Sequence, residues 1–115
     1  MATLTTQVLT RAGVGPTYAA ATGGGDAMTC GADNFLHIKN GAGATMTVTL
    51  AIPSGSSGYP NVAYTSTAVA VPNAGERMIG PIQAPIYQDP TTGLCTITYS
   101  TTASVTVGAF NVQEP

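Results

Sequence analysis

The residues of this sequence that could do chemistry are few and widely spaced. The chain holds one histidine and two cysteines, with three basic residues against five acidic ones. His37 is therefore the one imidazole that could act as the base of a Ser-His-Asp or Cys-His arrangement. It lies between Leu36 and Ile38 in an alternating segment, so we expect its side chain to face solvent or a partner protein. We predict no catalytic residues and no enzyme activity.

A metal site is not predicted either. Zinc takes four Cys or His ligands, or three with an open position, and Cys30, Cys95 and His37 lack any close ligand spacing. The two cysteines could pair with each other. The sequence shows no signal-peptide pattern, however, so we expect the protein to fold where thiols stay reduced.

The carboxylates and the glycine run have structural interpretations. Asp26, Asp33, Asp89 and Glu76 lie in turn-like contexts, where such side chains commonly cap the backbone. None of the aspartates belongs to a calcium-binding D-x-D-x-D-G run. The glycines at 23–25 lack the lysine and the serine or threonine of a phosphate-binding loop. We therefore predict no cofactor.

Threonine alternating with apolar residues is the dominant pattern of the chain, which contains nineteen threonines. In residues 45–52, Met46, Val48, Leu50 and Ile52 share one face and three threonines share the other. This period of two indicates a strand with one dry face and one uncharged polar face. The wet face of a soluble domain usually carries Lys and Glu, so the composition predicts that much of this surface lies against other protein.

Turn signals suggest how the strands connect. Asn-Gly at 40–41 favours a tight turn, which predicts that residues 35–39 pair antiparallel with 45–52. Residues 94–101 and 104–112 are predicted to form a last pair, with a β-bulge near Gly108. Residues 23–33 are predicted to be a loop, and the proline-rich stretch after residue 80 an irregular crossing without helix.

These segments predict an all-β protein. Seven or so short strands at roughly ten-residue spacing indicate an antiparallel β-sandwich, either a jelly roll or an immunoglobulin-like Greek key. We predict a single domain over residues 1–115, in which residues 1–12 form a first strand or an extended N-terminal arm.

The candidate binding residues are aromatic and basic. Charged residues make up 7% of the chain and the net charge is -2, so no basic patch for nucleic acid is expected, and no apolar run is long enough to span a membrane. Tyrosine gives a large contact area at low entropy cost. Glu76 beside Arg77 is interpreted as a surface ion pair. The candidate protein-interface residues are Arg11, Tyr18, Tyr59, Tyr87 and Arg77.

Several segments together resemble a known group of proteins. The succession of residues 34–41, 44–49, 69–81, 95–100 and 105–110 is similar to small β-sandwich virion proteins of tailed bacteriophages. The similarity spans about residues 3 to 112. Several proteins of this group decorate or cement the capsid.

The resemblance implies a non-enzymatic structural protein that binds an assembled shell. Its partner would be the major capsid protein or another virion protein, and the chain would form a homo-oligomer, a dimer or trimer. It would be made in the host cytoplasm and end on the capsid exterior, where an arm of residues 2–12 adds a strand to an exposed edge. The alternatives are a tail, neck or fibre component, or a carbohydrate- or cell-surface-binding β-sandwich module.

Overall fold

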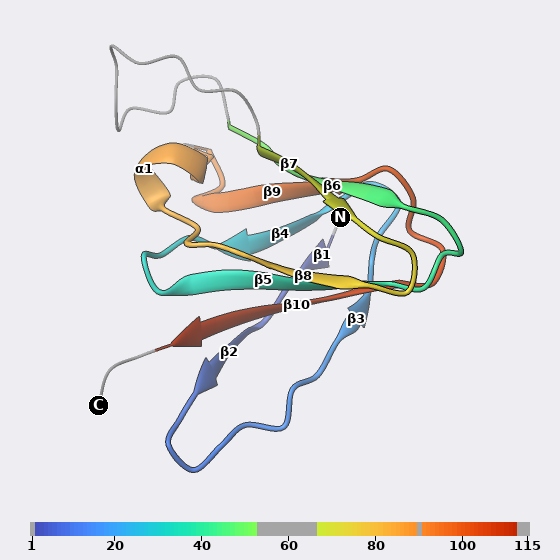
Figure 1. The fold of residues 1–115 in the computed structure, drawn as a ribbon. Helices are drawn as coiled ribbons and strands as arrows, with labels where there is room; N and C mark the ends of the chain where they lie inside the picture. The colour runs from blue at the N-terminus through green and yellow to red at the C-terminus, as the bar shows by residue number, and fades with distance from the viewer. Residues whose placement is uncertain (1, 53–66, 90, 113–115) are drawn as a thin grey trace.

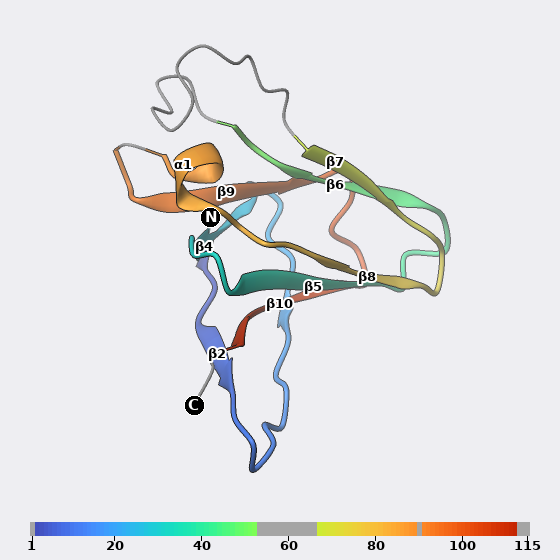
Figure 2. The ribbon, with the colours of Figure 1, turned by 60° about the vertical axis from the view of Figure 1, so that its left-hand side comes forward.

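The protein is a sandwich of two β-sheets, seen in a computed structural model that describes residues 2–52, 67–89 and 91–112 (Figures 1 and 2). Sheet A contains, in spatial order, β1 (Ala2–Thr3), β4 (Asp26–Thr29), β9 (Leu94–Tyr99), β6 (Met46–Leu50) and β7 (Thr67–Val71). Sheet B contains β2 (Thr6–Leu9), β10 (Val105–Val112), β5 (Asn34–Asn40) and β8 (Glu76–Ile79), with β3 (Ala19–Ala20) also paired to β10. The predicted all-β sandwich is confirmed.

The core lies between the two sheets and follows the predicted alternation. Met46, Val48 and Leu50 of β6 are buried, while the threonines between them are half-buried. Leu36 and Ile38 meet them from sheet B and are also buried. Each such side chain contributes about 1.5–3 kcal/mol when it leaves water, so these buried faces supply the main attraction between the two sheets.

The pairing of the strands is that of a jelly roll. β3 pairs with β10, β4 with β9, β5 with β8 and β6 with β7, all antiparallel. The pairs are nested: in chain order from β3 to β10, the first strand pairs with the last, the second with the last but one, and so on to the middle pair of β6 and β7. Two further contacts, β10 with β5 and β9 with β6, close this ribbon into two sheets. Of the two topologies left open by the sequence, the strand order selects the jelly roll.

The predicted hairpin between residues 35–39 and 45–52 is wrong, because β5 and β6 belong to different sheets. The side chain of Asn40 organises a crossing between the sheets instead of a tight turn. Its Nδ2 donates to the carbonyl oxygens of Ala44 and Val71, at 2.8 and 3.0 Å, and its Oδ1 accepts from the backbone N–H of Ala42 at 2.9 Å. The buried amide thus fastens β5 to the β7 end of sheet A.

The predicted last pair and the bulge are also wrong. β9 and β10 lie in different sheets, and β10 matches β5 residue for residue from Val105↔Asn40 to Asn111↔Asn34. The apolar parity changes at Phe110 because this side chain lies on the outer face of sheet B and is buried there. Gly108 leaves room for its ring, since a Cβ on Gly108 would lie 2.9 Å from Phe110 Cε2.

Two segments predicted as irregular contain regular structure. Residues 26–29, inside the predicted 23–33 loop, form β4, where Met28 is fully buried opposite Cys95. The proline-rich stretch contains one helical turn, α1 (Ala84–Tyr87). A strand of four residues beside a glycine run carries too short a pattern to be distinguished from a loop.

The N-terminal segment closes one side of the sandwich. β1 pairs in parallel with β4 and β2 pairs in parallel with β10, while the side chain of Leu4 between them is buried. The strands of the predicted arm are therefore used within the chain. The segment between β2 and β3 projects beyond sheet B in Figures 1 and 2.

The backbone conformation of Gly25, where the chain enters β4, can be tested by substitution. It has φ +94°, and a Cβ there would lie 2.6 Å from the carbonyl oxygen of Ile97. We expect Gly25→Ala to lower the free energy of unfolding by about 2 kcal/mol or more, because the left-handed conformation alone costs an L residue ~1–2 kcal/mol. Gly23→Ala is the matched control, since nothing lies within 4 Å of its Cβ. Equal urea midpoints for the two variants would contradict this packing.

Candidate functional site

His37 was expected to face solvent or a partner protein, and the first of these is wrong, because the residue is buried on the outer face of sheet B. The residue is 5% exposed. Its Nε2 lies 2.8 Å from Oε1 of Glu76, and its Nδ1 lies 2.7 Å from the hydroxyl oxygen of Tyr18. With a neutral ring, Nε2–H donates to the carboxylate and the Tyr18 hydroxyl donates to Nδ1. The carboxylate of Glu76 thus pairs with His37, whereas the guanidinium of Arg77 donates to the Glu76 backbone carbonyl.

Aromatic rings surround this histidine. Phe35 and Phe110 stack with ring centroids 5.5 Å apart, and Tyr18 meets His37 edge-on at 5.4 Å. The ammonium of Lys39 lies 3.9 Å from the centre of the Tyr18 ring, a cation–π contact. We call Tyr18, Phe35, His37 and Phe110 the aromatic cluster. It fastens the segment before β3 onto the outside of sheet B.

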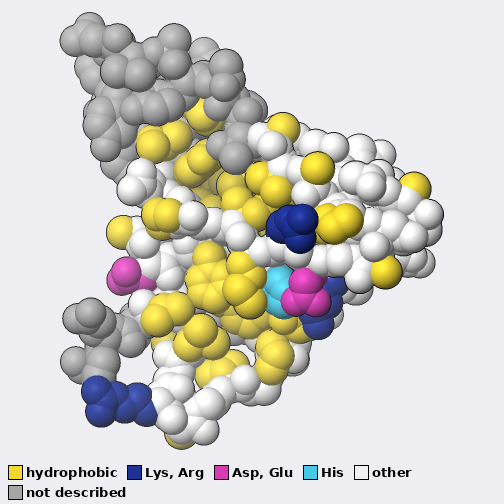
Figure 3. Space-filling view, viewed as in Figure 1, with side chains coloured by type: hydrophobic (Ala, Val, Ile, Leu, Met, Phe, Trp, Pro, Cys, Tyr) yellow, Lys and Arg dark blue, Asp and Glu magenta, His cyan; other side chains and the backbone are white. Residues whose placement is uncertain are grey.

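The Tyr18–His37–Glu76 chain orients the imidazole. Both ring nitrogens are occupied by protein partners and the ring is almost wholly covered. The adjoining groove, about 190 Å³, is lined mainly by apolar side chains that include Leu9, Val14 and Met78. Such a surface suits contact with another apolar side chain. Figure 3 shows hydrophobic side chains gathered around the histidine, beside an acidic side chain and between basic ones.

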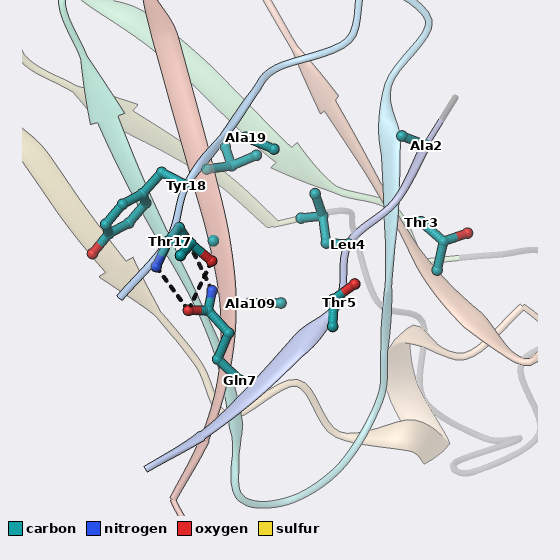
Figure 4. A pocket seen from close by; sticks show the side chains of 11 residues that line it. Ala2, Thr3, Leu4, Thr5, Gln7, Thr17, Tyr18, Ala19 and Ala109 are labelled. Atoms are coloured by element: carbon teal, nitrogen blue, oxygen red, sulfur yellow. Dashed lines mark hydrogen bonds between the residues drawn. The ribbon is translucent and has the colours of Figure 1, made fainter. Parts of the chain in front are cut away.

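A second groove lies where the N-terminal segment passes β3 (Figure 4). It measures about 230 Å³ and extends along the edge of β10 between its contacts with β2 and β3. The Gln7 side chain spans the gap. Its Nε2 donates to the Thr17 carbonyl and its Oε1 accepts from the Thr17 N–H, both at 2.8 Å. The amide therefore takes the place of a backbone strand pair.

Asp26 is a fully buried carboxylate, where the sequence suggested a turn cap. Its Oδ2 accepts from the Tyr99 hydroxyl at 2.7 Å and from the Thr22 N–H at 3.2 Å, and its Oδ1 accepts from the Ala2 N–H at 3.3 Å. Burial raises the pKa of Tyr99, and the hydrogen bond to the Asp26 carboxylate and its negative charge raise it further. Tyr99 therefore stays a hydrogen-bond donor.

Both cysteines are free thiols. Burial raises the pKa of Cys95 to about 12, with a further contribution from the neighbouring Cys30, whose own pKa is also raised by burial. Because the thiolate is the reactive form, both side chains are poor nucleophiles at neutral pH and serve to fill the core.

The outer face of sheet A is uncharged. Apart from Leu94, its outward-facing residues are Thr and Ala, and those at its centre are half-buried to exposed. We call this surface the threonine face and define it by Thr47, Thr49, Ala68, Ala70, Thr96 and Thr98. It is the uncharged, threonine-rich strand face that the alternation predicted, and no aromatic side chain among the described residues belongs to it.

The predicted interface residues lie on separate elements. Arg11 is exposed in the turn after β2, and Arg77 is exposed on β8. Tyr18 belongs to the aromatic cluster, and Tyr87 is half-buried in α1 against the core. Tyr59 lies outside the described residues. Of the four candidates that the structure describes, Tyr18 is the one that belongs to a larger site.

That site also contains His37, which was expected to face solvent or a partner, and three residues that were not predicted as interface residues: Phe35, Met78 and Phe110. A usable signal existed, because Phe35 and Phe110 are large apolar side chains at positions whose parity points away from the core.

Comparisons with known proteins give no identification: no protein-family model matches the chain, and no curated protein and no solved structure matches it. Within the described residues, no three His, Cys, Asp or Glu side chains gather as metal ligands. The same part of the chain has no helix with the length and apolarity to cross a membrane.

The hydrogen bonds of His37 can be tested by its tautomer. We expect nitrogen-15 NMR at neutral pH to show a ring protonated at Nε2, because Glu76 accepts from that atom. Tyr18→Phe keeps the ring packing but leaves Nδ1 unpaired, and should lower the free energy of unfolding by about 1–2 kcal/mol. A ring protonated at Nδ1 alone in the unmodified protein would contradict the arrangement, because Nε2 could not then donate to Glu76.

The Asp26–Tyr99 pair predicts an alkaline loss of stability. Because folding raises the pKa of Tyr99, its contribution is fully present below the unfolded value near 10 and is lost as pH rises above it. Tyr99→Phe should lower the free energy of unfolding by about 1–3 kcal/mol at pH 7, since Asp26 loses a donor. It should also flatten the decline above pH 10. Parallel stability curves for both proteins over that range would refute the pairing.

Proposed function

We propose that this chain is a non-enzymatic structural protein of a bacteriophage virion, most specifically a decoration or cement protein that binds the assembled head shell. Its partner is the major capsid protein, and its place is the capsid exterior. The proposal is supported by the resemblance of residues 3 to 112 to small virion sandwiches and by the nature of the threonine face.

The threonine face is the observation that carries the proposal. Its outward-facing side chains are Thr and Ala, so covering them removes no charge from water and freezes few rotatable bonds. The threonine hydroxyls can donate and accept hydrogen bonds across an interface. Tyr18 and the segment before β3 cover part of the outer face of sheet B, whereas among the described residues no such segment packs on the threonine face.

The mechanism is rigid bridging. A sandwich with a packed core changes shape little, so one molecule seated on two neighbouring shell subunits resists their separation. The same contact repeated across the lattice adds up by avidity, even where each contact is weak. Since β1 and β2 pair within the chain, this mechanism relies on the sheet face and needs no free arm. A dimer or trimer around a local symmetry axis would multiply the contacts further.

The test is binding to undecorated shells of the cognate phage. We expect saturable co-sedimentation and a higher disruption temperature for the shells. The double variant Ala70→Lys with Thr98→Lys should bind at least about tenfold more weakly, ~1.4 kcal/mol, because each buried ammonium lacks a partner. Both positions are exposed, so the variant should fold normally.

The matched control carries the same added charge elsewhere. Thr10→Lys with Thr91→Lys alters two exposed threonines outside the strands and should bind like the unmodified protein. Absence of binding to intact cognate shells would defeat the proposal. Few copies per virion by quantitative mass spectrometry would instead favour a tail, neck or fibre component.

A further inference from the structure

β8 is an edge strand whose second side has no strand beside it in the described part of the chain. The Asn40 N–H donates to the Gly75 carbonyl at 2.9 Å. This bond shows which residues of β8 point their backbone N–H and C=O groups toward β5. Residues 75, 77 and 79 turn their backbone groups toward β5, and Glu76 and Met78 turn theirs away. The outer edge of sheet B therefore presents backbone donors and acceptors from these two residues.

The Arg77 side chain occupies part of this edge. Its Nη1 donates to the Glu76 carbonyl at 2.8 Å, and this carbonyl is one of those that a docking strand would use. Its guanidinium has no carboxylate partner among the described residues. Met78, next along the strand, has no such cover. Its side chain is 67% exposed and borders the apolar groove of about 190 Å³.

A second copy of this chain does not complement the edge. When two β8 strands pair antiparallel through these free backbone groups, even-numbered residues face even-numbered ones and odd face odd. Arg77 would then lie opposite an odd-numbered residue of the other copy, such as Arg77 or Ile79. The one carboxylate of the strand, Glu76, is even-numbered and already pairs with His37. Self-pairing therefore leaves the guanidinium unmatched or opposite a like charge.

We propose that the free edge of β8 accepts an extended segment of another protein, with a carboxylate opposite Arg77 and an apolar side chain next to Met78. The carboxylate draws the guanidinium away from the Glu76 carbonyl, and this oxygen then accepts an N–H from the incoming strand. The neighbouring apolar side chain, on the opposite face of that strand, packs on Met78 over the groove. This inference goes beyond shell binding and does not depend on it.

The experiment uses short capped peptides of alternating threonine and valine, in which one central threonine is replaced by Glu, Gln or Lys. In nitrogen-15 NMR titrations, we expect the amides of Glu76 and Met78 to shift, and the Glu peptide to bind about fivefold more tightly than the Gln peptide. In Arg77→Glu, the Lys peptide should become the preferred one. Met78→Pro removes a free-edge N–H without touching the β5 ladder and should abolish binding.

Some outcomes would overturn the proposal. These are equal affinity for the Glu, Gln and Lys peptides, chemical-shift changes at amides away from β8, and no binding by any peptide. A further one is a dimer of the unmodified protein that Met78→Pro dissociates, which would assign the edge to a second copy. If Met78→Pro fails to fold, the peptide preference of Arg77→Glu still tests the proposal. Because no shell is used, failure here leaves the shell-binding proposal standing.

Discussion

The buried carboxylate of Asp26 is the interaction on which the arrangement of sheet A depends. A charge removed from water is tolerated only when hydrogen bonds replace its hydration, and here the donors come from three separate parts of the chain. The N–H of Ala2 positions β1, the N–H of Thr22 positions the turn before β4, and the hydroxyl of Tyr99 fixes the end of β9. The side chain of Asp26, which begins β4, thus connects β1 on one side and β9 on the other.

The outer faces of the two sheets differ in whether other parts of the described chain pack on them. Sheet B covers its own, because Tyr18 packs on His37 and Phe110 and so brings the segment before β3 against the strands. Sheet A leaves Thr and Ala open. This asymmetry fits a composition rich in threonine and poor in charge, because the threonine face carries no Lys or Glu, while Lys39 and Glu76 of sheet B contact Tyr18 and His37. It also explains why the open face is the one we assign to a partner.

The sequence predicted strands and their buried faces better than their partners. Alternation located Met46 to Leu50 and Cys95 to Ile97 correctly, because parity is a local property. Pairing is set by distant contacts. The Asn40 side chain bonds a carbonyl of residue 71, so Asn-Gly, although a typical hairpin signal, here begins a crossing between sheets. The burial of His37 was missed for the same reason, since its cover comes from a tyrosine nineteen residues away.

We propose that a capsid shell covers the threonine face. Electron cryomicroscopy of undecorated cognate shells incubated with the protein tests it most directly. We expect jelly-roll density bound across neighbouring shell subunits, with β6, β7 and β9 facing the shell and the aromatic cluster facing away from the threonine contact. Shells without added density, or with sheet A turned to solvent, would contradict it.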